Sequence, residues 1–186
     1  GVEVEFQPTA FDGIIPALTA KKIDAIMASM SITEERQKTI DFSNKYYNTP
    51  TGIIGPKGVA FDSSPEGLKG KILGVQVSTV HADYAKKYFG PVAAEIKEYQ
   101  TQDEANQDLA AGRIDAAQAD AIALEAFLTS DAGKACCEAK GNVVLASPQG
   151  QATGASAVYD IADRVVRMSG KVILAQGPNI LRGSSL

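Results

Sequence analysis

Leu18-Thr19-Ala20-Lys21-Lys22-Ile23-Asp24-Ala25 recurs later in the chain as Leu109-Ala110-Ala111-Gly112-Arg113-Ile114-Asp115-Ala116. Each copy has the pattern of a helix end, a basic or glycine stop signal, and then a short apolar strand. A polar residue follows each copy at the same offset, Ser29 after the first and Asp120 after the second. The repeat therefore predicts two similar α/β units. Because ligands bind beyond the carboxyl ends of strands in open α/β sheets, we expect two lobes that face one ligand.

The composition is that of a globular protein. The 186 residues are 45% hydrophobic and 22% charged, with a net charge of −4, which fits one good-sized domain or two small ones. There is no basic stripe of the kind that nucleic-acid-binding proteins carry. No apolar run approaches the length of about 20 residues that spans a bilayer. No GxGxxG, Walker, HExxH or zinc-ligand spacing occurs either. We therefore predict no cofactor, no metal and no nucleic-acid partner.

Hydrophobic periodicity predicts alternating strands and helices. Strands are expected at 2–6, 23–28, 71–77, 96–99, 114–119 and 143–146. Helices are expected at 14–18, 32–40, 79–89, 104–111 and 120–128, with a short one near Leu68 and with Ser31 and Glu34 as a capping box. This alternation favours α/β layers with mostly parallel sheets. Beyond Ser147 the pattern changes, and a helix at 158–168 and a strand at 171–175 are expected.

Two helix starts are candidate anion sites, because unpaired N–H groups and the helix dipole attract a carboxylate or a phosphate. The first follows Ser29-Met30-Ser31 and carries Arg36, whose guanidinium fork suits a carboxylate. The second follows Gln76-Val77-Ser78-Thr79. The alternative for the first start is that Ser31 only caps its helix and Arg36 makes a surface pair with Glu35 or near Asp41.

Three aspartates have different expected roles. Asp120 follows an apolar strand, so it is either a helix N-cap, the usual use of aspartate there, or a carboxylate that pairs with a ligand ammonium. Asp24 and Asp115 occupy matching places inside the repeat, and we expect a structural use for both, such as holding the turn.

The remaining candidate side chains are weaker signals. Phe11, Tyr46 and Tyr47 are either walls of a ligand site or core residues. His81 is the single histidine, and no partner stands at a catalytic spacing from it, which favours a surface or pocket-rim histidine in the first turn of a helix over a catalytic base. The adjacent cysteines at 136 and 137 favour two unpaired thiols over a vicinal disulfide, since a bridge between neighbours is strained.

The stretch Phe11-Asp12-Gly13-Ile14-Ile15-Pro16-Ala17-Leu18, together with Ser31-Ile32-Thr33-Glu34-Glu35-Arg36, resembles the periplasmic solute-binding proteins of polar amino-acid ABC transporters (bacterial solute-binding protein family 3). The similarity is to the lysine/arginine/ornithine-, histidine- and opine-binding type and runs from about residue 2 to 144. It implies a two-lobed α/β fold, the periplasmic-binding-protein type II fold, with lobe 1 incomplete. Residues 1–49 would be partial lobe 1, 50–146 lobe 2, and 147–186 an unmatched C-terminal segment that could return to lobe 1.

The resemblance also implies roles for individual residues. Arg36 would grip the ligand α-carboxylate, and Asp120 would pair with the α-ammonium. The assisting groups would be Ser31, Thr79 and Val80 at the carboxylate and Ser29 at the ammonium. Phe11 would stack on the ligand side chain, whereas Ala28, Gln76 and His81 stand where relatives vary with ligand preference. Relatives for basic amino acids often have Ser at the place of Ala28 and Leu at that of Gln76.

The implied function is the solute-binding component of an ABC-type amino-acid importer, which binds a polar or basic L-amino acid or an opine without catalysis. Its partners would be the amino acid and a membrane permease, its location periplasmic, and its precursor would carry a signal peptide. The incomplete lobe would expose a sheet edge that invites self-association. The alternatives are a dehydratase-like enzyme on the same scaffold, with His81 as its catalytic group, or a non-binding fragment that serves as an interaction module.

Overall fold

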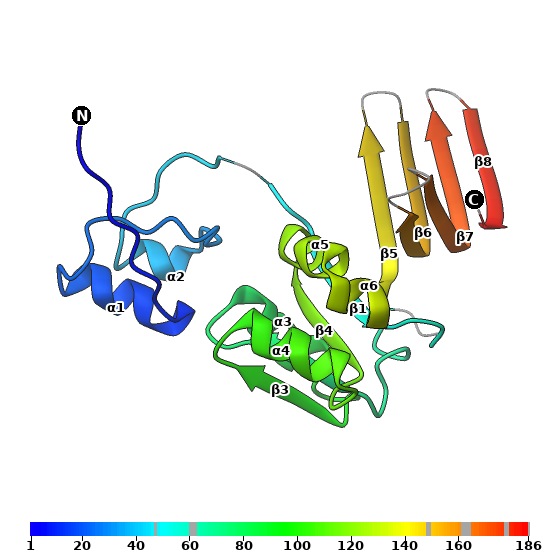
Figure 1. Cartoon of the computed structure of the whole chain (residues 1–186), viewed down its shortest axis with the longest axis horizontal. Helices are drawn as coiled ribbons and strands as arrows, with labels where there is room; N and C mark the ends of the chain where they lie inside the picture. The colour runs from blue at the N-terminus through cyan, green and yellow to red at the C-terminus, as the bar shows by residue number, and fades with distance from the viewer. Residues whose placement is uncertain (47, 60–62, 148–149, 161–164, 177–178, 186) are drawn as a thin grey trace.

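The computed structural model describes residues 1–46, 48–59, 63–147, 150–160, 165–176 and 179–185. Three parts follow one another along the chain (Figure 1). The N-terminal segment comprises residues 1–46. The central unit extends from strand β1 (Thr51–Pro56) to helix α6 (Asp131–Cys136), and the C-terminal strands extend from β5 (Cys137–Ser147) to β8 (Asn179–Ser185). In Figure 1 the C-terminal strands lie on the side of the central unit away from the N-terminal segment.

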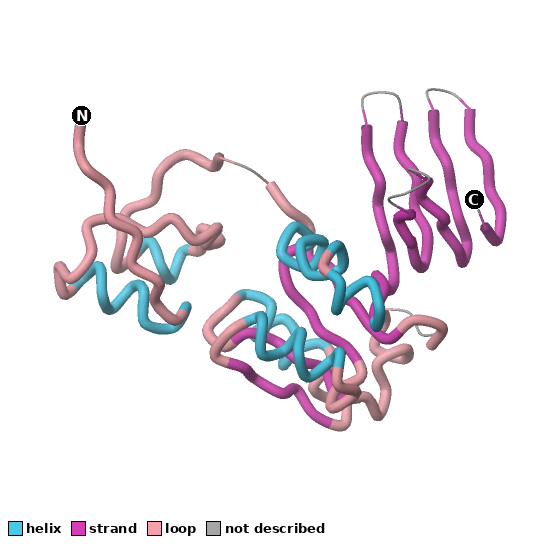
Figure 2. The backbone as a smooth tube through the Cα atoms, in the orientation of Figure 1, coloured by secondary structure: helices cyan, strands magenta, loops and turns pink. Residues whose placement is uncertain are grey.

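The N-terminal segment contains short helices and loops (Figure 2). Its elements are a 3₁₀ turn η1 at Phe11–Gly13, helix α1 at Ile14–Thr19 and helix α2 at Glu34–Gln37. The strands predicted at 2–6 and 23–28 are wrong, since those residues are in loops. A strand needs hydrogen bonds to a neighbouring strand, and no described strand pairs with either stretch.

The repeated phrase forms the same helix end in both copies. In the first, the N–H groups of Lys21 and Lys22 donate to the carbonyls of Leu18 and Ala17 at 3.0 and 2.9 Å. In the second copy, the N–H of residue 112 donates to the carbonyl of residue 109 at 3.0 Å, and the N–H of residue 113 donates to the carbonyl of residue 108 at 2.8 Å. These are the two bonds of a Schellman motif, which needs a left-handed residue. Lys21 at φ 57° and Gly112 at φ 70° provide it.

Replacing Gly112 by alanine tests this helix end. No atom lies within 4 Å of a Cβ built on Gly112, so the left-handed backbone alone sets the cost, about 1 kcal/mol of the free energy of unfolding. Gly112→Asn is the matched control, since asparagine tolerates this conformation better than alanine does. Its free energy of unfolding should fall by less than that of Gly112→Ala. Urea unfolding followed by circular dichroism measures both, and an unchanged stability in Gly112→Ala would refute the assignment.

The central unit is a four-stranded sheet with helices on both sides. Its strands are β1 (Thr51–Pro56), β2 (Ile72–Gln76), β3 (Glu95–Tyr99) and β4 (Ala116–Asp120). Its helices are α3 (Val80–Tyr88), α4 (Gln102–Ala110), α5 (Ala121–Thr129) and α6 (Asp131–Cys136). The elements predicted between 71 and 128 are thus confirmed. The short helix predicted near Leu68 is wrong, because residues 63–70 form bends and turns. Strand β2 is parallel to β3 and β4, whereas β1 is antiparallel to β4, so the mostly parallel sheet extends only across β3-β2-β4.

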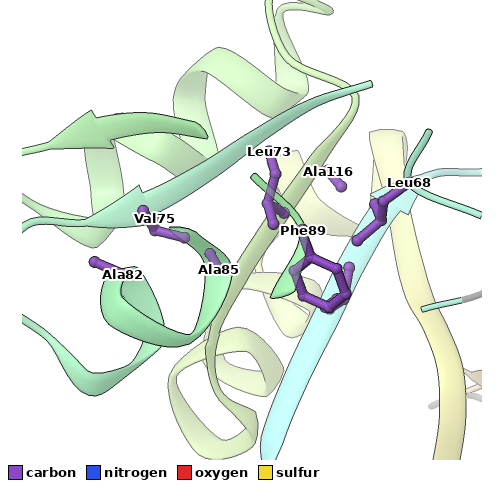
Figure 3. Close-up of a cluster of buried hydrophobic side chains, with 8 residues drawn as sticks. Leu68, Leu73, Val75, Ala82, Ala85, Phe89 and Ala116 are labelled. Carbon is purple, nitrogen blue, oxygen red and sulfur yellow. The ribbon is translucent and has the colours of Figure 1, made fainter. Parts of the chain in front are cut away.

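Alternating residues of the strands fill two apolar clusters. The first contains Leu73 and Val75 of β2 against α3 (Figure 3), and its other members are Ile53, Leu68, Ala82, Ala85, Phe89 and Ala116. The second cluster contains Ile54, Leu109, Ile114, Ala117, Ala119, Leu124 and Cys137. Between the strands, the carboxylate of Asp115 accepts a hydrogen bond from the N–H of Ile72 at 2.8 Å. The structural role predicted for Asp115 is therefore confirmed.

The C-terminal strands extend the sheet by antiparallel pairing in the order β3-β2-β4-β1-β5-β6-β7-β8. They are β5 (Cys137–Ser147), β6 (Gly150–Asp160), β7 (Val165–Gln176) and β8 (Asn179–Ser185). The predicted strands at 143–146 and 171–175 are confirmed. The predicted helix at 158–168 is wrong, because 158–160 end β6 and 165–168 begin β7, while 161–164 lie outside the described residues. Val158, Val165 and Val166 are β-branched and suit a strand better than a helix.

Cys136 and Cys137 form a vicinal disulfide at the junction between α6 and β5. The expectation of two unpaired thiols is therefore wrong, and its alternative, the vicinal bridge, holds. The backbone carbonyl of Cys136 accepts a hydrogen bond from the N–H of Lys57 at 2.8 Å, which ties this junction to the end of β1.

Asp108 is the centre of a charged cluster on α4 and β3. Its carboxylate accepts hydrogen bonds from Tyr99 Oη at 2.6 Å, Arg113 Nε at 2.7 Å and Lys97 Nζ at 3.0 Å. These bonds, that from Tyr99 first, hold the pKa of Asp108 well below its ordinary value of 3.8. The unfolded chain therefore binds a proton at Asp108 more readily than the folded chain does, so the cluster stabilises the fold above about pH 4 and progressively less below it.

Asp108→Asn should remove this pH-dependent stabilisation. We expect a lower urea midpoint than wild type at pH 7, and a difference that shrinks as the pH falls below about 4. Asp103→Asn on the same helix is the control, since Asp103 is exposed and contributes only to the charge of the first turn. A difference between Asp108→Asn and wild type that is constant from pH 7 to pH 3 would contradict the assignment.

Candidate functional site

Arg36 lies where the N-terminal segment meets the central unit. Its guanidinium donates from Nη1 to the carbonyl of Ser31 at 2.8 Å and from Nη2 to the carbonyl of Ser78 at 2.9 Å. The ring of Phe11 lies against it, with the guanidinium carbon 5.7 Å from the ring centroid. The surface pairing of Arg36 with Glu35 is absent among the described ion pairs. The side chain therefore joins the two parts of the chain.

Thr33, rather than Ser31, caps helix α2. The Thr33 hydroxyl accepts a hydrogen bond from the backbone N–H of Arg36 at 3.2 Å. The capping box predicted from Ser31 and Glu34 is therefore wrong, since the helix begins at Glu34 and Ser31 precedes its cap. With four residues, α2 has too few aligned peptides for a strong dipole, so the Arg36 side chain is the group here that attracts an anion.

Asp120 ends strand β4, and its side chain makes no capping hydrogen bond to helix α5. Its Oδ1 instead lies 3.3 Å from Nε2 of His81. On the other side of the ring, His81 Nδ1 lies 3.2 Å from the hydroxyl of Thr51. The predicted alternative of a plain N-cap is therefore wrong for Asp120, whose carboxylate contacts His81 and makes no capping hydrogen bond to α5.

Ser29 and Ser78 both have left-handed backbone conformations, with φ of 53° and 62°. Such conformations are costly for residues other than glycine and concentrate at functional sites. The N–H of Ser29 donates to the hydroxyl of Tyr46 at 2.9 Å, and the carbonyl of Ser78 receives Arg36. Tyr47, the other tyrosine considered as a wall, lies outside the described residues.

At the second predicted helix start, the Thr79 hydroxyl makes its hydrogen bonds within its own turn and helix. The hydroxyl of Thr79 accepts from the N–H of Ala82 at 3.1 Å and donates to the carbonyl of Gln76 at 2.7 Å. The Gln76 amide donates to the carbonyl of Gln100 at 3.1 Å. Val80, the first residue of α3, is half-buried. The Thr79 hydroxyl thus caps α3. An anion at this turn would be bound by its backbone N–H groups.

The sequence placed Ser78 only within the second predicted helix start, without its contact to Arg36, and Thr51 was not among the candidate residues. Nothing local distinguishes a left-handed serine in front of a helix from an ordinary loop serine. Thr51 stands directly after Pro50 in an extended segment, and nothing local connects it to a histidine 30 residues later.

The site holds two charges of opposite sign that have no counter-ion among the described residues. Among the described residues the Arg36 guanidinium donates to two carbonyls and lies against the Phe11 ring, and burial lowers its pKa despite the opposing effects of Asp83 and Glu35. Among the described ion pairs Asp120 contacts His81. Burial lowers the pKa of His81 more than Asp120 raises it. At pH 7 that ring is neutral. A half-buried charge without a partner is costly, so the arrangement favours a ligand that carries both charges.

Other chemistries lack support among the described residues. No group of three or more His, Cys, Asp or Glu side chains there could hold a metal ion. None of the helices in the described part of the chain is both long and apolar enough to cross a membrane.

Two protein families match the chain. Residues 1–66 match the bacterial extracellular solute-binding proteins, family 3. Residues 101–186 match the LptA/(LptD N-terminal domain) LPS transport proteins, a match that takes in the C-terminal strands. Residues 147–186, which did not fit the solute-binding pattern, thus have a likeness of their own.

Curated relatives and solved structures agree with the first match. The L-arginine-binding protein of Pseudomonas aeruginosa is 46% identical over 134 residues, 72% of this chain and 52% of its own. The lysine/arginine/ornithine-binding periplasmic protein of Escherichia coli is 40% identical over 154 residues, 82% and 59% of the two chains. The arginine-bound form of truncated ArgBP from T. maritima superposes with a TM-score of 0.69 at 31% identity, covering 88% of this chain and 72% of that one. The chain thus spans between half and three-fifths of the length of these curated relatives.

Proposed function

Since the chain belongs to the bacterial extracellular solute-binding proteins of family 3, with the type II α/β fold of its structural relatives, we propose that it captures a polar or basic L-amino acid for an ABC-type importer. The ligand would lie between Arg36 of the N-terminal segment and Asp120 of the central unit. In this proposal residues 1–49 are part of one lobe and residues 50–146 form the other.

The observation that carries the proposal is the pair of charges without counter-ions. The Arg36 guanidinium has five N–H donors, of which the two carbonyls occupy two, so three remain for a carboxylate. The Asp120 carboxylate uses one oxygen toward His81 and keeps the other for an ammonium. An α-amino acid carries both complementary groups on one carbon. Each end would then be held by a charge-assisted hydrogen bond from a different part of the chain.

L-arginine is the first ligand to test, because the names of the relatives specify arginine, or lysine, arginine and ornithine. Phe11, which lies against Arg36, supports a flat or long ligand side chain that stacks on its ring. Ser29, Ser31, Gln76, Thr79, Val80 and His81 would line the site around it. A histidine or an opine has the same α-carboxylate and α-nitrogen and is the next candidate.

The location and the partners follow from the same premise. The periplasmic relative supports a periplasmic location with a signal peptide in the precursor, and a membrane permease as the partner. Val2, Val4 and Phe6 are 90%, 65% and 83% exposed, which supports self-association through the N-terminal segment. Size-exclusion chromatography at two protein concentrations would detect that association.

A dehydratase-like activity on the same scaffold has less support. His81, the candidate catalytic group, has both ring nitrogens within hydrogen-bond distance of a protein side chain. A general base must lie within hydrogen-bond reach of the proton that it abstracts, and the described side chains within that distance of the ring nitrogens are Thr51 and Asp120. We therefore propose binding without catalysis. Turnover of prephenate that is lost in His81→Ala would reverse this choice.

Isothermal titration calorimetry tests the proposed function directly. The protein is titrated with L-arginine, L-lysine, L-ornithine, L-histidine and octopine, and putrescine and succinate serve as controls that carry charge of one sign only. We expect saturable 1:1 binding of at least one amino acid and none of either control. Absence of binding to all five ligands would contradict the proposal.

A further inference from the structure

Thr51, His81 and Asp120 come from three different elements and meet at one point. Thr51 and Asp120 stand directly opposite each other in the antiparallel pair of β1 and β4. His81, in the first turn of α3, lies across this pair and reaches both side chains, at 3.2 and 3.3 Å. Its residue is only 7% exposed. The imidazole is therefore held by two neighbours and by burial.

The identity of the partners fixes which nitrogen carries the proton. A carboxylate accepts hydrogen bonds only, so the ring nitrogen that faces Asp120, Nε2, must donate. Because burial lowers the pKa of His81, the ring is neutral at pH 7 and Nδ1 is an acceptor. The Thr51 hydroxyl then donates to Nδ1. Asp120 is the charged group that contacts this ring among the described residues.

We propose that His81 is a positioning residue: it fixes one oxygen of Asp120 so that the other points at the ligand ammonium. This inference rests on the proposed function. Without the contact to His81, the Asp120 side chain could rotate about two bonds. Ligand binding would then include the entropic cost of immobilising that side chain. With Nε2–H bound to Oδ1 and Thr51 holding the opposite side of the ring, that ordering is already complete. Groups at binding sites are most effective when a second layer of hydrogen bonds holds them.

The role can be separated from a merely structural one by removing the ammonium from the ligand. His81→Ala should weaken binding of L-arginine by about tenfold, the effect of one hydrogen bond of ordinary strength. It should leave binding of 5-guanidinopentanoate, which lacks the α-amino group, unchanged. His81→Gln, whose amide nitrogen reaches the place of Nε2, should restore arginine binding better than His81→Asn. Equal losses for both ligands, in variants with wild-type circular dichroism, would overturn the inference.

A second measurement needs no ligand. The chain contains one histidine, so its ring ¹⁵N resonances are assigned without further variants. We expect the neutral Nε2–H tautomer at pH 7 in wild type, and a loss of that preference in Asp120→Ala. A neutral Nδ1–H tautomer in wild type would overturn the inference while leaving the proposed function intact. Failure of wild type to bind any amino acid would overturn the proposed function and, with it, this role of His81.

Discussion

Arg36→Ala should weaken binding of L-arginine by roughly 100-fold or more. The guanidinium offers a carboxylate one or two charge-assisted hydrogen bonds, and each is worth about 1.5–3 kcal/mol. About 1.4 kcal/mol corresponds to a tenfold change in the dissociation constant. A bidentate contact would therefore cost about 3 kcal/mol or more when it is removed. Calorimetry or intrinsic tyrosine fluorescence measures the dissociation constant of the variant.

Arg113→Ala is the matched control for the loss of a guanidinium. Arg113 pairs with Asp108 at 2.6 Å, in the charged cluster of α4, and makes no described contact with Arg36, His81 or Asp120. We expect wild-type affinity in this variant. Arg36→Lys should fall between wild type and Arg36→Ala, since lysine keeps the charge but lacks the planar fork. If Arg36→Ala retained the affinity of Arg113→Ala, Arg36 would not hold the carboxylate.

Asp120→Asn should weaken binding of L-arginine by a similar factor, roughly 100-fold. The substitution keeps the shape and the hydrogen bond to His81 but removes the negative charge that faces the ammonium. An ammonium that loses its only counter-ion in a half-buried site incurs a desolvation cost of about 2–5 kcal/mol. Titration calorimetry with L-arginine provides the measurement.

Asp131→Asn is the control for Asp120→Asn. Asp131 is exposed at the first turn of α6, so its substitution removes the same charge away from the site and should leave the affinity unchanged. Equal affinities of Asp120→Asn and Asp131→Asn for L-arginine would assign the ammonium to another group. A parallel fall in affinity and in urea midpoint would instead point to a structural role for Asp120.

The central unit is the part of the fold that sequence patterns predicted best. Its strands and helices are regular, each helix from α3 to α5 follows a strand, and Leu73 and Val75 alternate as a buried strand requires. The repeat predicted equivalent helix ends, and the structure gives both the same pair of hydrogen bonds. The family resemblance drawn from residues 11–18 and 31–36 is confirmed by the comparisons.

The wrongly predicted strands and the wrongly predicted C-terminal helix lie where long-range pairing decides the structure. Val2, Val4 and Phe6 alternate as in a strand, yet pattern alone cannot supply the neighbour that a strand needs, and the segment is a loop. Residues 158–168 have helical spacing, but pairing of β6 with β7 prevails there. The capping box at Ser31 failed because Thr33, two residues later, is an equally good cap and lies at the actual helix start.

Within the site, residue types were predictable but their partners were not. Arg36 and Asp120 are charged residues beside predicted helix starts, and in the structure Arg36 lies within α2 and Asp120 directly before α5. The contacts of Arg36 with Ser78, and of His81 with Thr51, span 42 and 30 residues. No local rule covers contacts at that separation. The ligand-binding assignment of these residues stays a prediction.

The most direct test is a crystal structure of the protein with bound L-arginine. We expect the α-carboxylate about 3 Å from the Arg36 guanidinium and the α-ammonium at the same distance from the second oxygen of Asp120. A ligand that contacts neither side chain, or that lies with its α-carbon groups wholly on one part of the chain, would contradict this expectation.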